Sequence, residues 1–240
     1  MRELTFRNYS PRTIKSYLGM LVALSKHTGK SPDEVTTEEL KEYLYDAIHR
    51  RGLSVSYIKQ TISALKILYK DVLDKSWVDY VKIKMPRREY QIPEVLTKEE
   101  IQEMVEFTSN PKHKAIIALL YSSGMRRDEL INLQIKDIDS KRMFIRVNLG
   151  KGNKSRDVLL SSKALELLRQ YYKTHFPKPI KYVFEGGGKP GETYSASSIT
   201  NIIKGAAKKV GIKKNVHIHT LRHSFATHML EQGLAVREPT

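Results

Sequence analysis

The chain has 240 residues, of which 42 are Lys or Arg and 26 are Asp or Glu, so its formal net charge at pH 7 is +16. Hydrophobic residues make up 40% and charged residues 28% of the sequence, which excludes a disordered, collagen-like or disulfide-rich chain. The sequence has no cysteine, which excludes disulfides, thiolate nucleophiles and cysteine-ligated metal sites. The excess of positive charge predicts a polyanionic partner.

The sequence lacks the apolar stretch of about 18 residues that a membrane-spanning helix needs, and its first residues lack a signal peptide's apolar core. We therefore expect a cytoplasmic protein. Its partner would be a nucleic acid or an anionic membrane surface. The membrane surface is disfavoured, because no predicted helix combines a basic face with exposed large apolar side chains.

Cap signals and hydrophobic spacing predict that the first third of the chain is a bundle of helices. The predicted helices cover residues 10–29, 36–52 and 54–70. In the first, Ser10 followed by Pro11 is a typical helix start, and Gly29 ends the helix. In the third, Lys59 and Lys66 lie on a different face from the apolar residues, so they form either a solvated surface or a surface that contacts DNA.

A polar, basic segment follows the helical bundle. Residues 86–96 contain Arg87 and Arg88 between two prolines, which predicts an extended linker. We therefore expect a helical domain at residues 1–85 and a second domain at residues 97–240.

The second domain is predicted to be mainly helical with a small antiparallel β-sheet. The expected helices cover residues 97–105, 111–124, 127–133, 161–172, 195–210 and 220–232. Strands are expected at 143–147 and 157–160, with a short strand at 182–184. The two longer strands form a hairpin whose tip, GKGNKSR, carries Lys151 and Lys154. A lysine on a glycine-bearing turn is either an exposed turn residue or a mobile group that reaches a phosphate.

Two local patterns look like ligand sites, but neither is complete. The glycine-rich run 186–191 lacks the Lys-Ser/Thr that follows in a P-loop. His219 and His223 are four residues apart on one helix face, a spacing that can bind zinc. The residue after His219 is threonine where a zinc protease has glutamate, and Arg222 lies between the histidines. We therefore expect no metal and no cofactor, and interpret His223 and His228 as polar residues packed under the helix.

Three segments together resemble a known family. YSSGMRRDELINLQIKDID carries Arg126, GKGNKSRDVLL carries Lys151, and HTLRHSFATHML carries His219 and Arg222. In this order and spacing they resemble the tyrosine recombinases, the phage-integrase and Xer-type enzymes. The resemblance covers residues 97 to about 237 strongly, and the helical amino-terminal part resembles the family's SAM-like core-binding domain.

The resemblance implies a catalytic site that acts on the scissile phosphate of DNA without a metal ion. Arg126 and Arg222 would hold the non-bridging oxygens and offset the charge that develops in the transition state. Lys151 would act as general acid toward the departing 5′ oxygen, and His219 would hydrogen-bond the phosphate. Glu129 matches an acidic position that we interpret as supporting the arginines.

The resemblance also implies a tyrosine nucleophile, for which this chain offers no candidate. The last of its thirteen tyrosines is Tyr194, whereas the family's nucleophile follows the motif that begins at His219. We therefore expect a site-specific recombinase or integrase truncated at its carboxy end, without the nucleophile and the preceding His or Trp motif. Either it is part of an enzyme that cleaves and rejoins DNA through a 3′-phosphotyrosine, or it acts only as a DNA-binding module.

Further residues are candidates for DNA contact outside the catalytic set. They are Lys59, Lys66, Arg87, Arg88, Lys154, Ser195 and Ser197. The basic side chains would contact phosphates, and the two serines would do so at a helix start, where backbone N–H groups are available. The expected partner is double-stranded DNA, with self-association on DNA and without a membrane or a small-molecule substrate.

Overall fold

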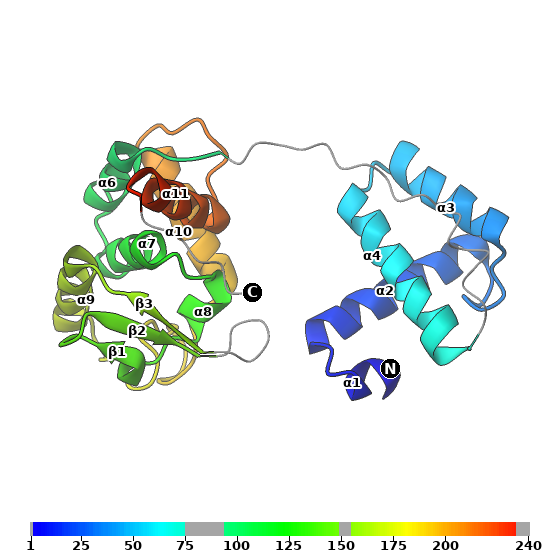
Figure 1. Cartoon of the computed structure of the whole chain (residues 1–240), viewed down its shortest axis with the longest axis horizontal. Coiled ribbons are helices and arrows are strands. Elements are labelled where there is room, and N and C mark those ends of the chain that lie inside the picture. Colours follow the sequence, from blue (N-terminus) through cyan, green and yellow to red (C-terminus); the bar gives the residue numbers. More distant parts are fainter. Residues whose placement is uncertain (1, 75–93, 149–154, 234–240) are drawn as a thin grey trace. The chain divides into compact units, whose positions relative to one another are not determined.

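The computed structural model describes residues 2–74, 94–148 and 155–233, and the chain divides into two compact units, Met1–Gln91 and Ile92–Thr240 (Figure 1). Four predicted site residues lie outside the described residues: Arg87, Arg88, Lys151 and Lys154. In the part of the chain that the structure describes, no helix is long and apolar enough to cross a membrane.

The first unit is helical, as predicted. Its elements are α1 (Arg2–Phe6), α2 (Pro11–Thr28), α3 (Thr37–His49), α4 (Val55–Lys66) and the π-helix η1 (Ile67–Val72). The predicted start of α2 is confirmed, because the side chain of Ser10 accepts the backbone N–H of Thr13 at 3.1 Å. Helix α1 was not predicted from the sequence.

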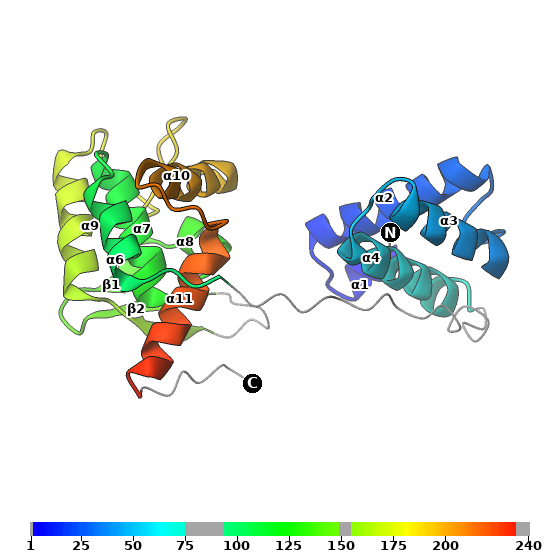
Figure 2. The same cartoon turned by 90° about the horizontal axis from the view of Figure 1, so that it is seen from above.

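The core of the first unit lies where α2, α3 and α4 pack against one another (Figure 2). Tyr43 and Tyr69 are its largest fully buried side chains. The hydroxyl of Tyr69 donates to the carbonyl of Val35 at 3.2 Å, so the ring is buried with its polar end satisfied. Lys59 is partly exposed and Lys66 is exposed, so both ammonium groups are on the surface side of this core.

The second unit surrounds helix α7 with other helices and a small sheet (Figure 1). Its helices are α6 (Lys98–Glu106), α7 (Pro111–Ser123), α8 (Arg127–Ile131), the 3-10 helix η2 (Ile135–Asp137), α9 (Ser162–Thr174), α10 (Ala196–Lys209) and α11 (Ile218–Glu231). Helix α7 packs against α6, α9, α10, α11 and strand β3 (Arg156–Leu159). Ile116, Ile117 and Leu119 are fully buried, because neighbours cover α7 on all sides.

The sheet is antiparallel with the strand order β1-β2-β3, where β1 is Ile138–Asp139 and β2 is Phe144–Val147. The predicted hairpin is confirmed, with Phe144 paired to Leu159 and Val147 paired to Arg156. Along β2, Ile145 and Val147 face the core and alternate with exposed residues. The hairpin therefore fixes where its tip begins and ends.

The strand predicted at 182–184 is wrong. Tyr182 forms only an isolated bridge with Gln134. The backbone N–H groups of Ile180, Lys181 and Tyr182 all donate to one carboxylate oxygen of Glu185, at 2.8–3.1 Å. These N–H groups converge on a side chain, so the segment turns instead of extending along a sheet.

The end of the expected linker packs onto the second unit. Leu96 is fully buried in the core of this unit. Lys214 donates to the carbonyl of Val95 at 3.1 Å, and Glu94 accepts the backbone N–H of Asn215 at 2.7 Å. Residues 94–96 are therefore part of the folded unit.

Candidate active site

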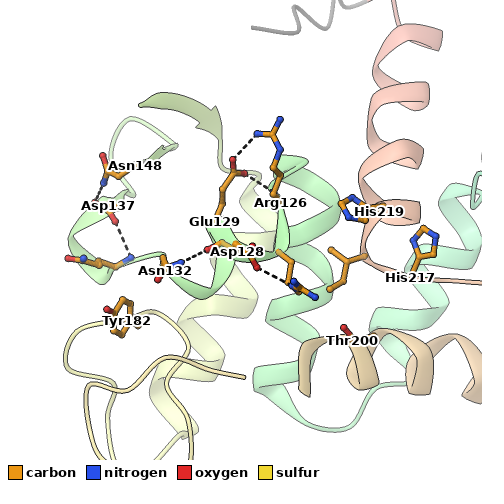
Figure 3. A pocket seen from close by; sticks show the side chains of 13 residues that line it. Arg126, Asp128, Glu129, Asn132, Asp137, Asn148, Tyr182, Thr200, His217 and His219 are labelled. Atoms are coloured by element: carbon orange, nitrogen blue, oxygen red, sulfur yellow. Dashed lines mark hydrogen bonds and ion pairs between the residues drawn. The ribbon is translucent and has the colours of Figure 1, made fainter. Parts of the chain in front are cut away.

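A cavity of about 820 Å³ lies in the second unit between α8, α10 and α11, and the predicted residues Arg126, Glu129 and His219 line it (Figure 3). The lining also includes Arg127, Asn132, Asp137, Asn148, Thr200 and His217. Figure 3 shows Arg126 and Glu129 beside each other at the start of α8, with His219 on the neighbouring helix α11. The fold thus brings two distant sequence segments to one opening.

Arg126 is positioned by the turn between α7 and α8. Gly124 ends α7 with φ +59°, and Arg126 then stands directly before the first residue of α8 in extended conformation. A Cβ atom at Gly124 would lie 2.6 Å from Cδ1 of Phe225 on α11. Glycine is therefore required here both for its φ angle and for the close approach of α11.

Arg222 is bound to the same turn. Its Nη1 donates to the carbonyl of Gly124, two residues before Arg126. His219 and Arg222 are three residues apart on α11, so they project from the same side of the helix. The structure therefore places His219 and Arg222 on one side of α11 and bonds Arg222 to the turn that carries Arg126, although Arg222 itself does not line the cavity.

Glu129 is the acidic centre of this group. Its side chain is 5% exposed, and its two oxygens accept from Arg126 and Arg156. Burial alone would raise the pKa of this carboxyl, but the hydrogen bonds and charges of the two arginines outweigh burial and lower the pKa to about 2. Glu129 is therefore ionised at neutral pH.

Two histidines stand at the start of α11. His217 caps the helix, because its Nδ1 accepts the backbone N–H of Thr220 at 3.1 Å. The ring centroids of His217 and His219 are 6.0 Å apart. Desolvation of the ring, followed by the charges of His217, His223 and the arginines 127 and 222, lowers the pKa of His219. The neutral form of His219 is therefore favoured at neutral pH.

The other histidines of this helix differ from each other. His228 is buried and its Nδ1 pairs with the hydroxyl of Tyr121 at 2.9 Å, which confirms its interpretation as a packed polar residue. His223 is exposed, so the same interpretation is wrong for it, because its position on α11 faces away from the core. Within residues 2–74, 94–148 and 155–233, no cluster of three or more His, Asp or Glu side chains could hold a metal ion.

The remaining candidates lie away from this cavity. Ser195 caps α10 by accepting the backbone N–H of Ser198 at 3.0 Å, and Ser195 and Ser197 are both exposed. Neither lines the cavity. Arg156, by contrast, belongs to the site through Glu129, although the sequence analysis did not select it. Arg156 begins the strand that returns from the GKGNKS tip, and this place in the sequence does not by itself indicate a bond to Glu129.

Known protein families match both units of the chain. The phage integrase family matches residues 94–238, and the SAM-like N-terminal domain of phage integrases matches residues 1–79. The chain belongs to the phage integrase family of tyrosine recombinases. The fold that the sequence predicted, mainly helical with a small antiparallel sheet, is confirmed.

Relatives within this family cover almost the whole chain. The tyrosine recombinase XerA of Pyrococcus horikoshii is 33% identical over 98% of this chain and 79% of its own length. A tyrosine recombinase of Thermosipho africanus is 32% identical over 96% of this chain and 83% of its own length. Among solved structures, a lambda integrase dimer bound to a core site has a TM-score of 0.76, with 16% identity over 96% of this chain and 87% of that one. The last likeness concerns the fold.

Proposed function

We propose that this recombinase-family chain binds double-stranded DNA and holds the scissile phosphate between Arg126, His219 and Arg222. The observation that carries the proposal is the bond between Arg222 and the carbonyl of Gly124, which joins α11 to the turn that presents Arg126. Guanidinium groups remain charged and present planar donor pairs that match phosphate oxygens. The net charge of +16 provides long-range attraction to the same partner.

The proposed chemistry is strand cleavage and rejoining without a metal ion, in which a tyrosine hydroxyl attacks the scissile phosphorus, a 3′-phosphotyrosine forms and the 5′ oxygen leaves. The residues named here would supply the phosphate site for that attack and not the tyrosine. The two arginines would stabilise the negative charge of the pentacoordinate phosphate, and His219 would hydrogen-bond one of its oxygens. Lys151, in the hairpin tip outside the described residues, would protonate the departing 5′ oxygen. Glu129 would hold Arg126 in place, since the carboxylate of Glu129 accepts hydrogen bonds from both the backbone N–H and the guanidinium of Arg126.

The two units would share the DNA. We assign residues 1–85 as a core-binding domain, residues 86–96 as a linker and residues 97–240 as the catalytic-type domain. Lys59 and Lys66 on α4, Arg87 and Arg88 in the linker, Lys154 in the hairpin tip, and Ser195 and Ser197 at the start of α10 would add phosphate contacts. Self-association on the DNA is part of this proposal, supported by the lambda integrase dimer on its core site. A DNA substrate would place the protein in the cytoplasm.

We infer that the nucleophile is not among the thirteen tyrosines of this sequence. Tyr43, Tyr69 and Tyr171 are buried to at least 98%, which prevents attack on a phosphate. Tyr182 does line the cavity, but Figure 3 shows it near Asn132 and Asp137, on the side opposite His219. On this inference, the residues of this sequence would hold DNA without forming a covalent bond to it, as a DNA-binding module would.

The test is a titration of a fluorescent DNA duplex with the protein at several salt concentrations. Arg126→Ala and Arg222→Ala are expected to weaken binding and to lower the slope of log affinity against log salt by about one each. Arg169→Ala is the matched control, because this exposed arginine of α9 removes the same charge away from the cavity. Salt-independent binding, or equal loss from all three variants, would contradict the proposal.

A nicked suicide duplex tests the inference about the nucleophile. We expect no covalent protein–DNA adduct on a denaturing gel. An adduct would show that one of the thirteen tyrosines attacks DNA, and its disappearance in Tyr182→Phe would identify Tyr182.

A further inference from the structure

Arg156 forms the strongest ion pair of the site. Its Nη1 donates to Oε1 of Glu129 at 2.8 Å, and its Nη2 donates to Oε2 at 2.7 Å. Two parallel hydrogen bonds from a guanidinium to a buried carboxylate fix the carboxylate's orientation as well as its charge. Arg156 begins strand β3. The pair therefore joins the hairpin to helix α8, which carries Glu129.

The same carboxylate also holds Arg126. Oε1 of Glu129 accepts Nη1 of Arg126 at 3.0 Å, and Oε2 accepts the backbone N–H of Arg126 at 2.7 Å. One buried negative charge is thus shared by two guanidinium groups. Because Arg156 balances the charge of Glu129, the group as a whole keeps the positive charge of Arg126.

We propose that Arg156 is a positioning residue for phosphate binding: through Glu129 it orients the guanidinium of Arg126, and it neutralises the carboxylate that otherwise competes with a phosphate for Arg126. The inference rests on the proposed function. Arg156 does not line the cavity, and its side chain is 26% exposed. Its action is therefore exerted through Glu129 and not by contact with DNA.

Two variants that differ in the net charge of the Arg126–Glu129 pair distinguish this positioning role from simple support of the fold. In Arg156→Met, Arg126 is the remaining cationic partner of Glu129 among the described residues, so the pair has no net charge and Arg126 is drawn onto the carboxylate. In the double variant Arg156→Met with Glu129→Gln, the carboxylate is gone and the charge of Arg126 is restored. The double variant lacks both native ion pairs, so it does not restore the packing.

The experiment measures the affinity of the full chain for the same fluorescent duplex at one low salt concentration. Arg156→Met is expected to bind about tenfold more weakly, which is the effect of losing one charge-assisted contact. The double variant is expected to recover at least half of that loss on a logarithmic scale. Arg156→Lys keeps the charge but has no planar fork, so we expect it to stay within about threefold of the native chain.

Arg146→Met is the matched control in the same hairpin. Arg146 on β2 pairs with Asp157 at 3.1 Å, and both side chains are about half exposed or more. The variant removes the same charge and the same fork from a pair that does not touch Glu129. We expect its affinity to change less than threefold. Urea unfolding of every variant shows which of them are folded under the conditions of the titration.

The outcomes are distinct. If Arg156→Met binds like Arg146→Met, or if the double variant binds no better than Arg156→Met, Arg156 does not act through Glu129 and the inference is overturned. If Arg156→Met fails to fold, the double variant still tests the inference, because the neutral amide that Glu129→Gln introduces leaves no unpaired buried charge. In that case, affinity of the double variant close to the native value supports the inference, and affinity tenfold lower refutes it. Failure of the native chain to bind DNA would refute the proposed function itself.

Discussion

The hydroxyl oxygen of Ser224 on helix α11 accepts the backbone N–H of Leu96 at 2.9 Å, although the two residues are 128 positions apart. Both residues are fully buried, and the same hydroxyl donates to the carbonyl of Thr220 at 2.8 Å. The helix that carries His219 and Arg222 is thereby bonded to the first residues of its unit. One hydroxyl thus helps to fix the position of the candidate site.

Ser224→Ala is expected to destabilise the chain by about 1–3 kcal/mol, because it leaves the buried N–H of Leu96 without its acceptor. Urea unfolding followed by circular dichroism measures this difference. Ser122→Ala is the matched control: Ser122 lies near the end of α7, and its buried hydroxyl has no hydrogen-bond partner among the described residues. The control is expected to be neutral or slightly stabilising. Equal losses in both variants would show that the bond to Leu96 contributes nothing.

Gly124→Ala is expected to destabilise the second unit and to weaken DNA binding. The new methyl group would lie 2.6 Å from the ring of Phe225, in a backbone conformation with φ +59°. Relief requires the ring of Phe225 to shift, and we expect this shift to disturb the packing of α11 against the turn to which Arg222 is bonded. We expect a loss of at least about 2 kcal/mol, since the overlap adds to the backbone strain.

Gly211→Ala separates these two causes. Gly211 also has a positive φ, of +75°, but a methyl group there meets nothing within 4 Å. Only the backbone cost remains, about 1 kcal/mol, and DNA binding should be unchanged. If Gly124→Ala and Gly211→Ala have equal effects on stability and binding, the contact with Phe225 does not matter.

Glu129 should make stability depend on acidity. Its pKa is lowered from 4.5 to about 2 in the fold, so the folded chain binds fewer protons than the unfolded chain between these values. The stabilisation, about 3 kcal/mol, is complete above pH 5 and is lost as the pH falls toward 2. Glu129→Gln cannot ionise, so its stability should be lower at pH 7 and should change less between pH 5 and pH 3.

Urea unfolding at pH 7, 5 and 3 measures this dependence. Glu166→Gln is the matched control, because Glu166 pairs with Lys163 on the surface of α9 with 68% of its side chain exposed. The control should follow the native curve. A native chain and a Glu129→Gln variant with the same slope between pH 5 and pH 3 would show that the pair with Arg156 does not lower the pKa of Glu129.

The sequence was sufficient for the features that local chemistry determines. The start of α2 followed from Ser10 and Pro11, since the side chain of Ser10 accepts a nearby backbone N–H group. The meeting of Arg126 with His219 was inferred from family resemblance, because nothing local in the sequence joins residues that far apart.

The features that the sequence did not predict depend on tertiary contacts. The segment at 182–184 has the composition of a strand, but the N–H of Tyr182 donates to Glu185, and Tyr182 forms only an isolated bridge with Gln134. The importance of Arg156 was hidden because alternation in a hairpin does not reveal that one arginine reaches a carboxylate 27 residues earlier. Burial of the carboxylate that Arg156 reaches is visible only in the folded chain.

His219 should couple DNA binding to proton uptake. Desolvation and the positive neighbours lower its pKa in the free chain, whereas a phosphate beside it would favour the protonated ring. DNA binding would then raise the pKa of His219 and take up a proton, so affinity should increase as the pH falls from 8 to 6.

His219→Gln cannot take up the proton, and its affinity should depend less on pH over this range. His49→Gln is the matched control, since His49 at the end of α3 is exposed and is not among the groups that lower the pKa of His219, and it should keep the native dependence. Duplex titrations at pH 6, 7 and 8 measure all three proteins. If His219→Gln keeps the full native dependence, the proton is taken up elsewhere and His219 does not contact the phosphate in its protonated form.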